Sequence, residues 1–271
     1  MSQETQRPAV TVERLRRMKA EGEPIACLTA YDASFARLLD EAGVDVLLVG
    51  DSLGMVIGGH ETTVPVTMEE MVYHTRAVSR GRRRALLVAD MPFMSYATPE
   101  QAVANAARLM QEGGAHAVKL EGGRTQVETV GRLAGCGIPV CAHLGLQPQS
   151  VHKLGGYRVQ GRAPDAARAM VEDAGALEAA GADLLVLEAV PSALAREAQA
   201  ALGIPVIGIG AGPGCDGQVL VLYDALGITP GRVPRFARNF LTDGRDVRGA
   251  LRAFVEAVKG CSFPGPEHEL A

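Results

Sequence analysis

The sequence lacks the features that mark several large classes of protein. None of its 271 residues belongs to a stretch approaching ~18 uninterrupted apolar residues, and the amino-terminal MSQETQRPAV is polar. We therefore expect no membrane span and no signal peptide, and a cytoplasmic location. The net charge is −4, and the one run of cations is Arg82-Arg83-Arg84, so the chain offers no basic face to nucleic acid.

Cysteine is also scarce, and its spacing argues against a metal or disulfide framework. The five cysteines form no C-x-x-C pair. An odd count in a chain of this length fits reduced, mostly buried thiols better than disulfides. Zinc bound by cysteine is therefore not expected at Cys27, Cys136, Cys141, Cys215 or Cys261.

Short apolar runs recur along the chain, each after a helical pattern that ends at glycine. They begin at residues 25, 44, 85, 116, 138, 182 and 204, and a weaker eighth run begins at 218. They are continuous rather than alternating, as expected of parallel strands covered by helices. Eight units over 271 residues average about 34 residues each, the size of a βα unit. This pattern predicts an α/β fold.

The predicted architecture is a single-domain (β/α)8 TIM barrel over residues 1–271. A short polar segment precedes it, and the tail GCSFPGPEHELA from residue 260 is expected to be irregular surface. Helix boundaries are clear in places. Thr67 with Glu70 and Thr98 with Gln101 both match a capping box, and Gly43 follows an apolar helical face.

Polar residues end most of the predicted strands. In a parallel barrel the carboxyl ends of the strands meet at one face, where the active site lies. We therefore expect these residues to line one site. They are Asp51, Ser52, Asp90, Lys119, Glu121, His143 and Glu188.

Three of these residues, Asp51, Asp90 and Glu121, are carboxylates expected on one ring of the barrel. Without a cation they would repel one another and raise at least one pKa. Carboxylate oxygens suit Mg²⁺, whereas histidine-rich clusters favour zinc. The sequence therefore predicts a Mg²⁺ site here. The alternative for Glu121 is an ion pair with Lys119 or an arginine.

The remaining polar strand ends have more than one interpretation. Lys119 could form a Schiff base, hold a substrate carboxylate, or neutralise Glu121, and the nearby ligand set favours the second. Glu188 follows the apolar run LLVL and is a candidate general base, with a surface glutamate as the alternative. The role of His143 stays open.

Two motifs invite other functions. Gly50-Asp51-Ser52-Leu53-Gly54 fits the G-x-S-x-G nucleophile elbow, but the late D-x-x-H of G-D-S-L esterases is missing. We interpret Ser52 as a donor beside a metal ligand. The glycines from 212 to 217 match G-x-G-x-x-G without an acidic residue about 20 positions later. We interpret them chiefly as tight-turn backbone, with a phosphate loop as the alternative.

Several long, collinear blocks carry a family resemblance. They include VGDSLG, ADMPFMSY, AVKLEGG, AHLGLQPQS, LVLEAVP and IGIGAGPGCDGQVLVLYDALG, within a match from about residue 10 to the FP near 264. These blocks resemble the ketopantoate hydroxymethyltransferase family. The resemblance implies a (β/α)8 barrel, assembled as a homodecamer of two pentameric rings.

The same resemblance implies a reaction and roles for matched residues. A keto acid, 3-methyl-2-oxobutanoate, takes a one-carbon unit from 5,10-methylenetetrahydrofolate through a Mg²⁺-stabilised enolate and gives 2-dehydropantoate, on the way to pantothenate. Asp51 and Asp90 would bind Mg²⁺, with Glu121 completing the site directly or through water. The keto acid would contact Asp51, Ser52, Asp90 and Lys119, and Glu188 would accept the proton. The folate-binding residues are not identified.

Two alternatives remain. One is a metal-dependent carbon–carbon lyase of the isocitrate lyase and phosphoenolpyruvate mutase kind, whose K-K-C-G-H loop is absent from this sequence. The other is a barrel that acts as a binding or assembly protein, which the intact set of polar strand ends disfavours.

Overall fold

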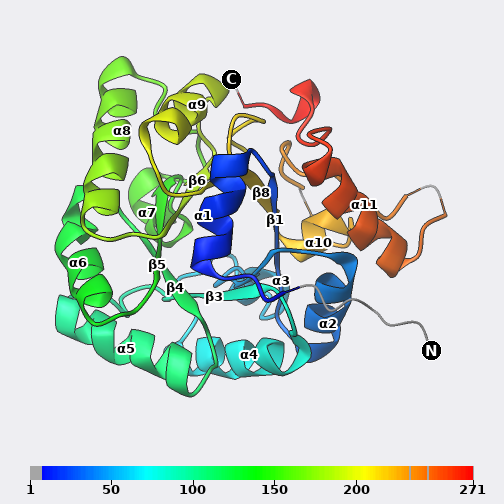
Figure 1. Cartoon of the computed structure of the whole chain (residues 1–271), viewed down its shortest axis with the longest axis horizontal. Helices are drawn as coiled ribbons and strands as arrows, with labels where there is room; N and C mark the ends of the chain where they lie inside the picture. Colours follow the sequence, from blue (N-terminus) through cyan, green and yellow to red (C-terminus); the bar gives the residue numbers. More distant parts are fainter. Residues whose placement is uncertain (1–7, 232, 243, 271) are drawn as a thin grey trace.

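The structure, a computed structural model, describes residues 8–231, 233–242 and 244–270. Eight parallel strands close into a barrel in sequence order, with β1 paired to β8 (Figure 1). This confirms the predicted (β/α)8 barrel and its weak eighth strand. The strands are β1 Ile25–Thr29, β2 Val46–Val49, β3 Leu86–Asp90, β4 Ala117–Glu121, β5 Val140–Gly145, β6 Leu184–Glu188, β7 Val206–Ile209 and β8 Gly217–Leu220.

Helices form a ring outside the strands, and one further helix precedes β1 (Figure 1). In the described part of the chain, no helix combines the length and apolar character needed to cross a bilayer. The longer outer helices are α2 Ala33–Ala42, α4 Met68–Gly81, α5 Pro99–Gln111, α6 Val127–Gly135, α8 Pro164–Ala179, α9 Ser192–Ala201 and α11 Val247–Lys259. Short helices α3 Leu53–Val56, α7 Val151–Leu154 and α10 Leu222–Ala225 follow strands or turns.

The helix-boundary predictions hold with one exception. Gly43 ends α2 with φ 98°, a left-handed conformation that suits glycine. Thr67 and Glu70 form the complete capping box. The second box is only half formed, because the Gln101 side chain accepts from the backbone N–H of Ala97 at 2.9 Å instead of from Thr98. Its amide nitrogen also donates to the backbone oxygen of Met94 in the preceding loop, which explains why the side chain turns away from Thr98.

Two apolar layers hold the barrel together. Strand residues that face outward pack against the helix ring, whereas those that face inward form a second cluster inside the barrel. Helix α1, Val12–Glu21, closes the amino-terminal end by adding Leu15 and Met18 to the inner cluster. Because side chains alternate along a strand, Leu86 and Val88 place Asp90 inward as well. The inner layer thus becomes polar toward the carboxyl end.

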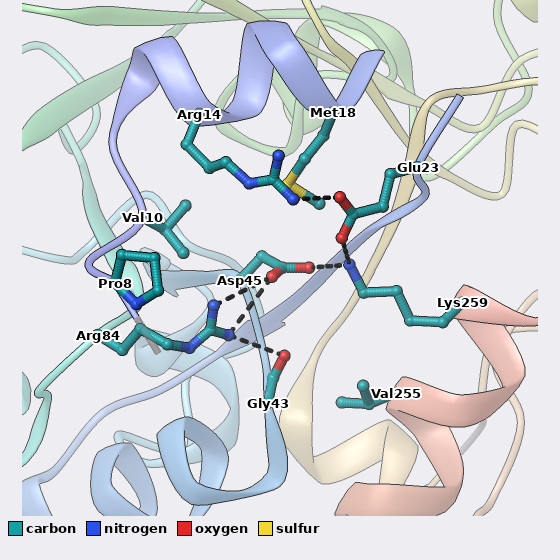
Figure 2. A pocket seen from close by; sticks show the side chains of 10 residues that line it. All are labelled: Pro8, Val10, Arg14, Met18, Glu23, Gly43, Asp45, Arg84, Val255 and Lys259. Atoms are coloured by element: carbon teal, nitrogen blue, oxygen red, sulfur yellow. Dashed lines mark hydrogen bonds and ion pairs between the residues drawn. The ribbon is translucent and has the colours of Figure 1, made fainter. Parts of the chain in front are cut away.

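A cavity of about 320 Å³ lies beneath α1 at the amino-terminal ends of the strands (Figure 2). Its charged side chains pair with one another. Lys259 Nζ lies 2.7 Å from Asp45 Oδ2 and 3.3 Å from Glu23 Oε1, and Arg84 contacts the other oxygen of Asp45. Arg14 pairs with Glu23. These ion pairs tie α1, α11 and the strand starts together, so this end of the barrel serves stability.

The two ends of the chain differ from the expectation in one respect. Residues 1–7 of the predicted polar segment, and residue 271, lie outside the described residues. The tail is irregular apart from the 3-10 turn Pro266–His268, and its assignment to the surface was wrong only for the buried Phe263, Pro264 and His268. Phe263 is buried at 4% exposure, and its ring centroid lies 5.5 Å from that of Phe240. Its large apolar ring covers the end of α11.

All five cysteines are free thiols, which confirms that part of the expectation. Cys27 and Cys141 are buried within the barrel, and Cys215 is half-buried. The expectation of mostly buried thiols was wrong for Cys136 and Cys261, which are exposed. Both follow the ends of outer helices, where the chain turns at the surface.

Burial of Phe263 makes a stability prediction. We expect Phe263→Ala to lower the free energy of unfolding by about 3–5 kcal/mol, since it leaves a cavity among aromatic rings. Urea denaturation followed by circular dichroism would measure this change. Glu256→Ala, at an exposed position of α11, is the matched control and should stay within about 0.5 kcal/mol of the wild type. A Phe263→Ala loss as small as that of the control would contradict the packed tail.

Candidate active site

Strand register brings the predicted polar residues into one buried cluster. In the β3–β4 pair, Asp90 is the register partner of Lys119. In the β4–β5 pair, Glu121 is the partner of His143. Glu188 ends β6 on the neighbouring strand. The barrel thus gathers at its carboxyl end side chains that lie far apart in the sequence.

Lys119 and Asp90 form an ion pair inside the barrel. Lys119 Nζ lies 3.1 Å from Asp90 Oδ1, and their side chains are 5% and 4% exposed. The other oxygen of Asp90 accepts a hydrogen bond of 3.1 Å from the backbone N–H of Asp51. Asp90 therefore connects the lysine on β4 to the loop after β2. The ion-pair partner of Lys119 is Asp90, and not the Glu121 of the alternative interpretation.

His143, whose role the sequence left open, lies between two carboxylates. Its Nδ1 is 3.3 Å from Glu121 Oε1, and its Nε2 is 3.3 Å from Glu188 Oε2. Nδ1 also lies 3.2 Å from Lys119 Nζ. The Glu188 side chain is 16% exposed, against 2% for His143. Glu188 is therefore the most exposed member of this group.

The electrostatics reflect an excess of buried negative charge. Burial, together with the charges of Asp90 and Glu121, raises the pKa of Asp51 well above its usual range. Burial likewise raises the pKa of Asp90, although the Lys119 ammonium partly offsets the effect. This confirms the expectation that at least one carboxyl pKa is raised.

Two other groups keep their charges. Burial opposes ionisation of Glu121, but the contact with His143 and the charge of Lys119 outweigh it and lower the pKa of Glu121. Burial also opposes a charged Lys119, yet the carboxylates of Asp90 and Glu121 raise its pKa. The cluster therefore contains a stable ammonium, one ionised carboxylate and two carboxylates whose charged forms are disfavoured.

The pair Asp51 and Asp90 suits a divalent cation that has two protein carboxylates as ligands, rather than three. Among the residues that the structure describes, no three His, Cys, Asp or Glu side chains come together as a metal-holding group. Glu121 faces His143 and Gln149. Mg²⁺ is commonly held by one or two carboxylates, with water and substrate oxygens completing its shell. A cation beside Asp51 and Asp90 would also stabilise their charged forms.

Gln149 is a site residue that sequence reasoning missed. Its Nε2 donates to Asp51 Oδ2 at 2.8 Å and to the backbone oxygen of Met91 at 2.9 Å. Its backbone N–H donates to Glu121 Oε2 at 3.1 Å, and Tyr96 donates to its Oε1. One residue thus orients two carboxylates, Asp51 through its side-chain amide and Glu121 through its backbone N–H. It lies in the 3-10 turn Pro148–Ser150 beyond β5, so inspection of strand ends alone did not find it.

Ser52 has a phenol as its neighbour. Its Oγ lies 2.9 Å from the hydroxyl of the buried Tyr31. A nucleophile elbow requires a histidine base at this position, and the partner here is a tyrosine. A Cβ at Gly50 would lie 2.7 Å from Ser52 Oγ, so a side chain there would displace this hydroxyl. The geometry agrees with the interpretation of Ser52 as a hydrogen-bonding group.

The glycine-rich segment after β7 serves backbone packing. Gly212 has φ 75°, and a Cβ there would lie 2.1 Å from Ser192 Oγ of α9. The segment leads into β8, whereas a dinucleotide fingerprint opens a helix. This confirms the tight-turn interpretation.

Comparison with known proteins identifies the family. The sequence signature described as ketopantoate hydroxymethyltransferase matches residues 9–266. The chain belongs to the ketopantoate hydroxymethyltransferase family. It is 65% identical over 267 residues to the 3-methyl-2-oxobutanoate hydroxymethyltransferase of Alkalilimnicola ehrlichii, covering 98% of this chain and 96% of the relative. The protein of the same name from Halorhodospira halophila is 63% identical, covering 96% and 94%.

Solved structures of more distant proteins share the barrel. A putative phosphonomutase from Burkholderia cenocepacia superposes with a TM-score of 0.62 at 18% identity, over 80% of this chain and 93% of that one. A 2,3-dimethylmalate lyase of the PEP mutase/isocitrate lyase superfamily gives 0.56 at 19% identity, over 80% and 82%. At this identity the likeness concerns the fold alone.

Substitutions at Gln149 test its place in the cluster. Gln149→Ala removes the donor to the buried Asp51, so we expect the free energy of unfolding to fall by about 1–3 kcal/mol. Gln149→Glu keeps the shape but places a carboxylate beside Asp51 and Glu121, so at pH 8 it should destabilise more than alanine does. Urea unfolding of both variants measures the order. The reverse order would contradict the donor role.

Proposed function

We propose that this protein transfers a hydroxymethyl group from 5,10-methylenetetrahydrofolate to 3-methyl-2-oxobutanoate, giving 2-dehydropantoate for pantothenate biosynthesis. Family membership supports the reaction class. The observation that carries the assignment is the partly exposed Glu188, which His143 connects to the buried ion pair of Lys119 and Asp90. A base accessible to substrate thus lies next to groups that can hold an anionic keto acid.

In this proposal Asp51 and Asp90 hold Mg²⁺, and Glu121 completes the site directly or through water. When bound, the cation would withdraw electron density from the carbonyl and carboxylate oxygens of the keto acid. The contact of the Asp51 N–H with Asp90 keeps the two aspartates together. Gln149 fixes the orientation of Asp51 through its amide.

The keto acid would be oriented by charged and hydroxyl groups of the same cluster. Lys119 supplies a permanent positive charge for its carboxylate, because neighbouring carboxylates keep the ammonium protonated and raise its pKa. Ser52, held by Tyr31, contributes a hydrogen bond. Lys119 therefore acts as a cation, without forming a Schiff base.

Glu188 is the proposed base. Its Oε atoms take the proton from carbon 3 of the keto acid, and the resulting carbanion, delocalised as an enolate, attacks the one-carbon unit of the donor. The contact of Oε2 with His143 fixes the carboxylate on one side. In the net reaction one water supplies the hydroxyl oxygen. The two donor nitrogens that lose the carbon each gain a proton as tetrahydrofolate leaves.

The proposal extends to assembly and partners. We propose a cytoplasmic homodecamer, whose partners are the keto acid and the folate, with neither nucleic acid nor membrane among them. The two alternatives are less well supported. The likeness to lyases concerns the fold alone, and a purely structural role leaves the buried cluster of Asp51, Asp90 and Lys119 without a purpose.

Deuterium exchange tests the base directly. With Mg²⁺ and 3-methyl-2-oxobutanoate in D₂O, the wild type should exchange the carbon-3 proton without folate, since proton removal precedes transfer. Glu188→Gln should abolish this exchange while leaving keto acid binding largely intact, because the amide keeps the shape and loses the basicity. Proton NMR follows the exchange, and isothermal titration follows binding.

The control is Glu197→Gln, at an exposed position of α9, which should exchange at the wild-type rate. Excess chelator should stop exchange in the wild type. Undiminished exchange by Glu188→Gln would place the base elsewhere, and full exchange in chelator would remove the metal from the proposal.

A further inference from the structure

The mouth of the barrel has an apolar rim above its charged floor. Among the described residues, four of the seven exposed large apolar side chains follow β2, β3 or β5 at the carboxyl end of the barrel. They are Ile57, Phe93, Met94 and Tyr157. Catalysis as proposed above uses none of them. Exposed apolar groups gathered beside a reactive cluster are typical of a ligand-binding edge.

Tyr157 contacts the short helix that follows Asp51 and Ser52. Its residue surface is 49% exposed, and its hydroxyl donates to Met55 Sδ of α3 at 3.5 Å. Burial and then the charges of Glu188 and Asp51 raise the pKa of its phenol. The hydroxyl end is therefore held at α3, next in the chain to Asp51 and Ser52, while part of the residue stays open to solvent.

The segment that carries Tyr157 is attached to the strand end that carries Glu188. The backbone N–H of Gln160 donates to the oxygen of Ala189, the residue after Glu188, at 2.9 Å. Gly161 packs so tightly that a Cβ would lie 2.4 Å from Leu194 Cδ2. The end of this segment is thus anchored beside the strand end that carries Glu188.

The charge of this segment is one-sided. Residues 151–162 read VHKLGGYRVQGR, with three Lys or Arg residues and no acid. Lys153 and Arg158 are exposed on either side of the tyrosine. An exposed ring flanked by cations is complementary to a ligand that has a flat conjugated ring and a carboxylate tail.

Geometry separates this ligand from the keto acid. The keto acid is small and anionic and suits the buried floor of Lys119 and Asp90. The opposite end of the barrel is closed by α1, so the second substrate must approach from the rim. The one-carbon donor combines a fused planar ring with a glutamate tail, so it is complementary to an exposed aromatic ring flanked by cations.

We propose that residues 151–162 form the donor subsite, where the Tyr157 ring packs against the fused ring of the folate while Lys153 and Arg158 bind its glutamate carboxylates. This inference rests on the proposed function. It assigns the folate contacts to a loop rather than to the strand ends.

Tetrahydrofolate, the released product, is the binding probe. Tyr157→Leu should raise the dissociation constant for tetrahydrofolate about tenfold in the presence of Mg²⁺, because a leucine keeps apolar bulk but lacks the stacking face. Tyr157→Phe should stay within about threefold of the wild type, since the ring is kept. The KM for 3-methyl-2-oxobutanoate should not change in either variant. Tyr73→Leu, at an exposed tyrosine on α4, is the matched control.

The tail contact is tested with a truncated ligand. Arg158→Gln should weaken tetrahydrofolate binding about fivefold or more, because it removes a cation near the glutamate carboxylates. Tetrahydropteroate, which has the ring but no glutamate, should bind the variant and the wild type equally. Equal losses for both ligands would overturn the tail assignment.

Two results would overturn the subsite as a whole. One is unchanged tetrahydrofolate binding by Tyr157→Leu. The other is a rise in the KM for the keto acid by the same factor as the rise in the dissociation constant for tetrahydrofolate. Circular dichroism checks the fold of each variant, and Tyr157→Phe tests the ring independently if leucine is not tolerated. Deuterium exchange by the wild type separates the outcomes: without exchange the proposed function fails, whereas exchange with unchanged donor binding rejects only the subsite.

Discussion

The buried ion pair between Lys119 and Asp90 is the contact on which the rest of the site depends. Both side chains are almost fully enclosed, and removing one partner of such a pair leaves an uncompensated charge that typically costs about 3–5 kcal/mol. The pair allows Asp51 and Glu121 to be buried beside it. The carboxyl end of the barrel thus keeps an excess of negative charge, which a cation bound together with an anionic substrate can balance.

The two ends of the barrel handle buried charge differently. At the amino-terminal end Asp45 is shared between Lys259 and Arg84, beneath a helix that closes the opening (Figure 2). At the carboxyl end, burial, together with the charge of Glu121, raises the pKa of both Asp51 and Asp90. Buried charges that are neutralised by ion pairs favour stability, whereas buried charges that are not fully neutralised favour ligand binding.

The barrel and the strand-end residues follow from the sequence because both have a regular signal. A continuous apolar run ending in a polar residue locates Asp90 and Glu188 without a structure. Gln149 has no such signal, since its contacts with Asp51 and Glu121 depend on how a turn beyond β5 folds back. Phe263 was misassigned for a similar reason: its contact with Phe240 joins irregular segments that have no period.

In the proposed reaction, one buried cluster binds the keto acid and a divalent cation beside a more exposed base. A crystal structure of the protein with Mg²⁺ and 3-methyl-2-oxobutanoate would show this arrangement. We expect the cation at Asp51 and Asp90, the substrate carboxylate near Lys119, and carbon 3 facing Glu188. A cation bound elsewhere, or a keto acid joined covalently to Lys119, would contradict it.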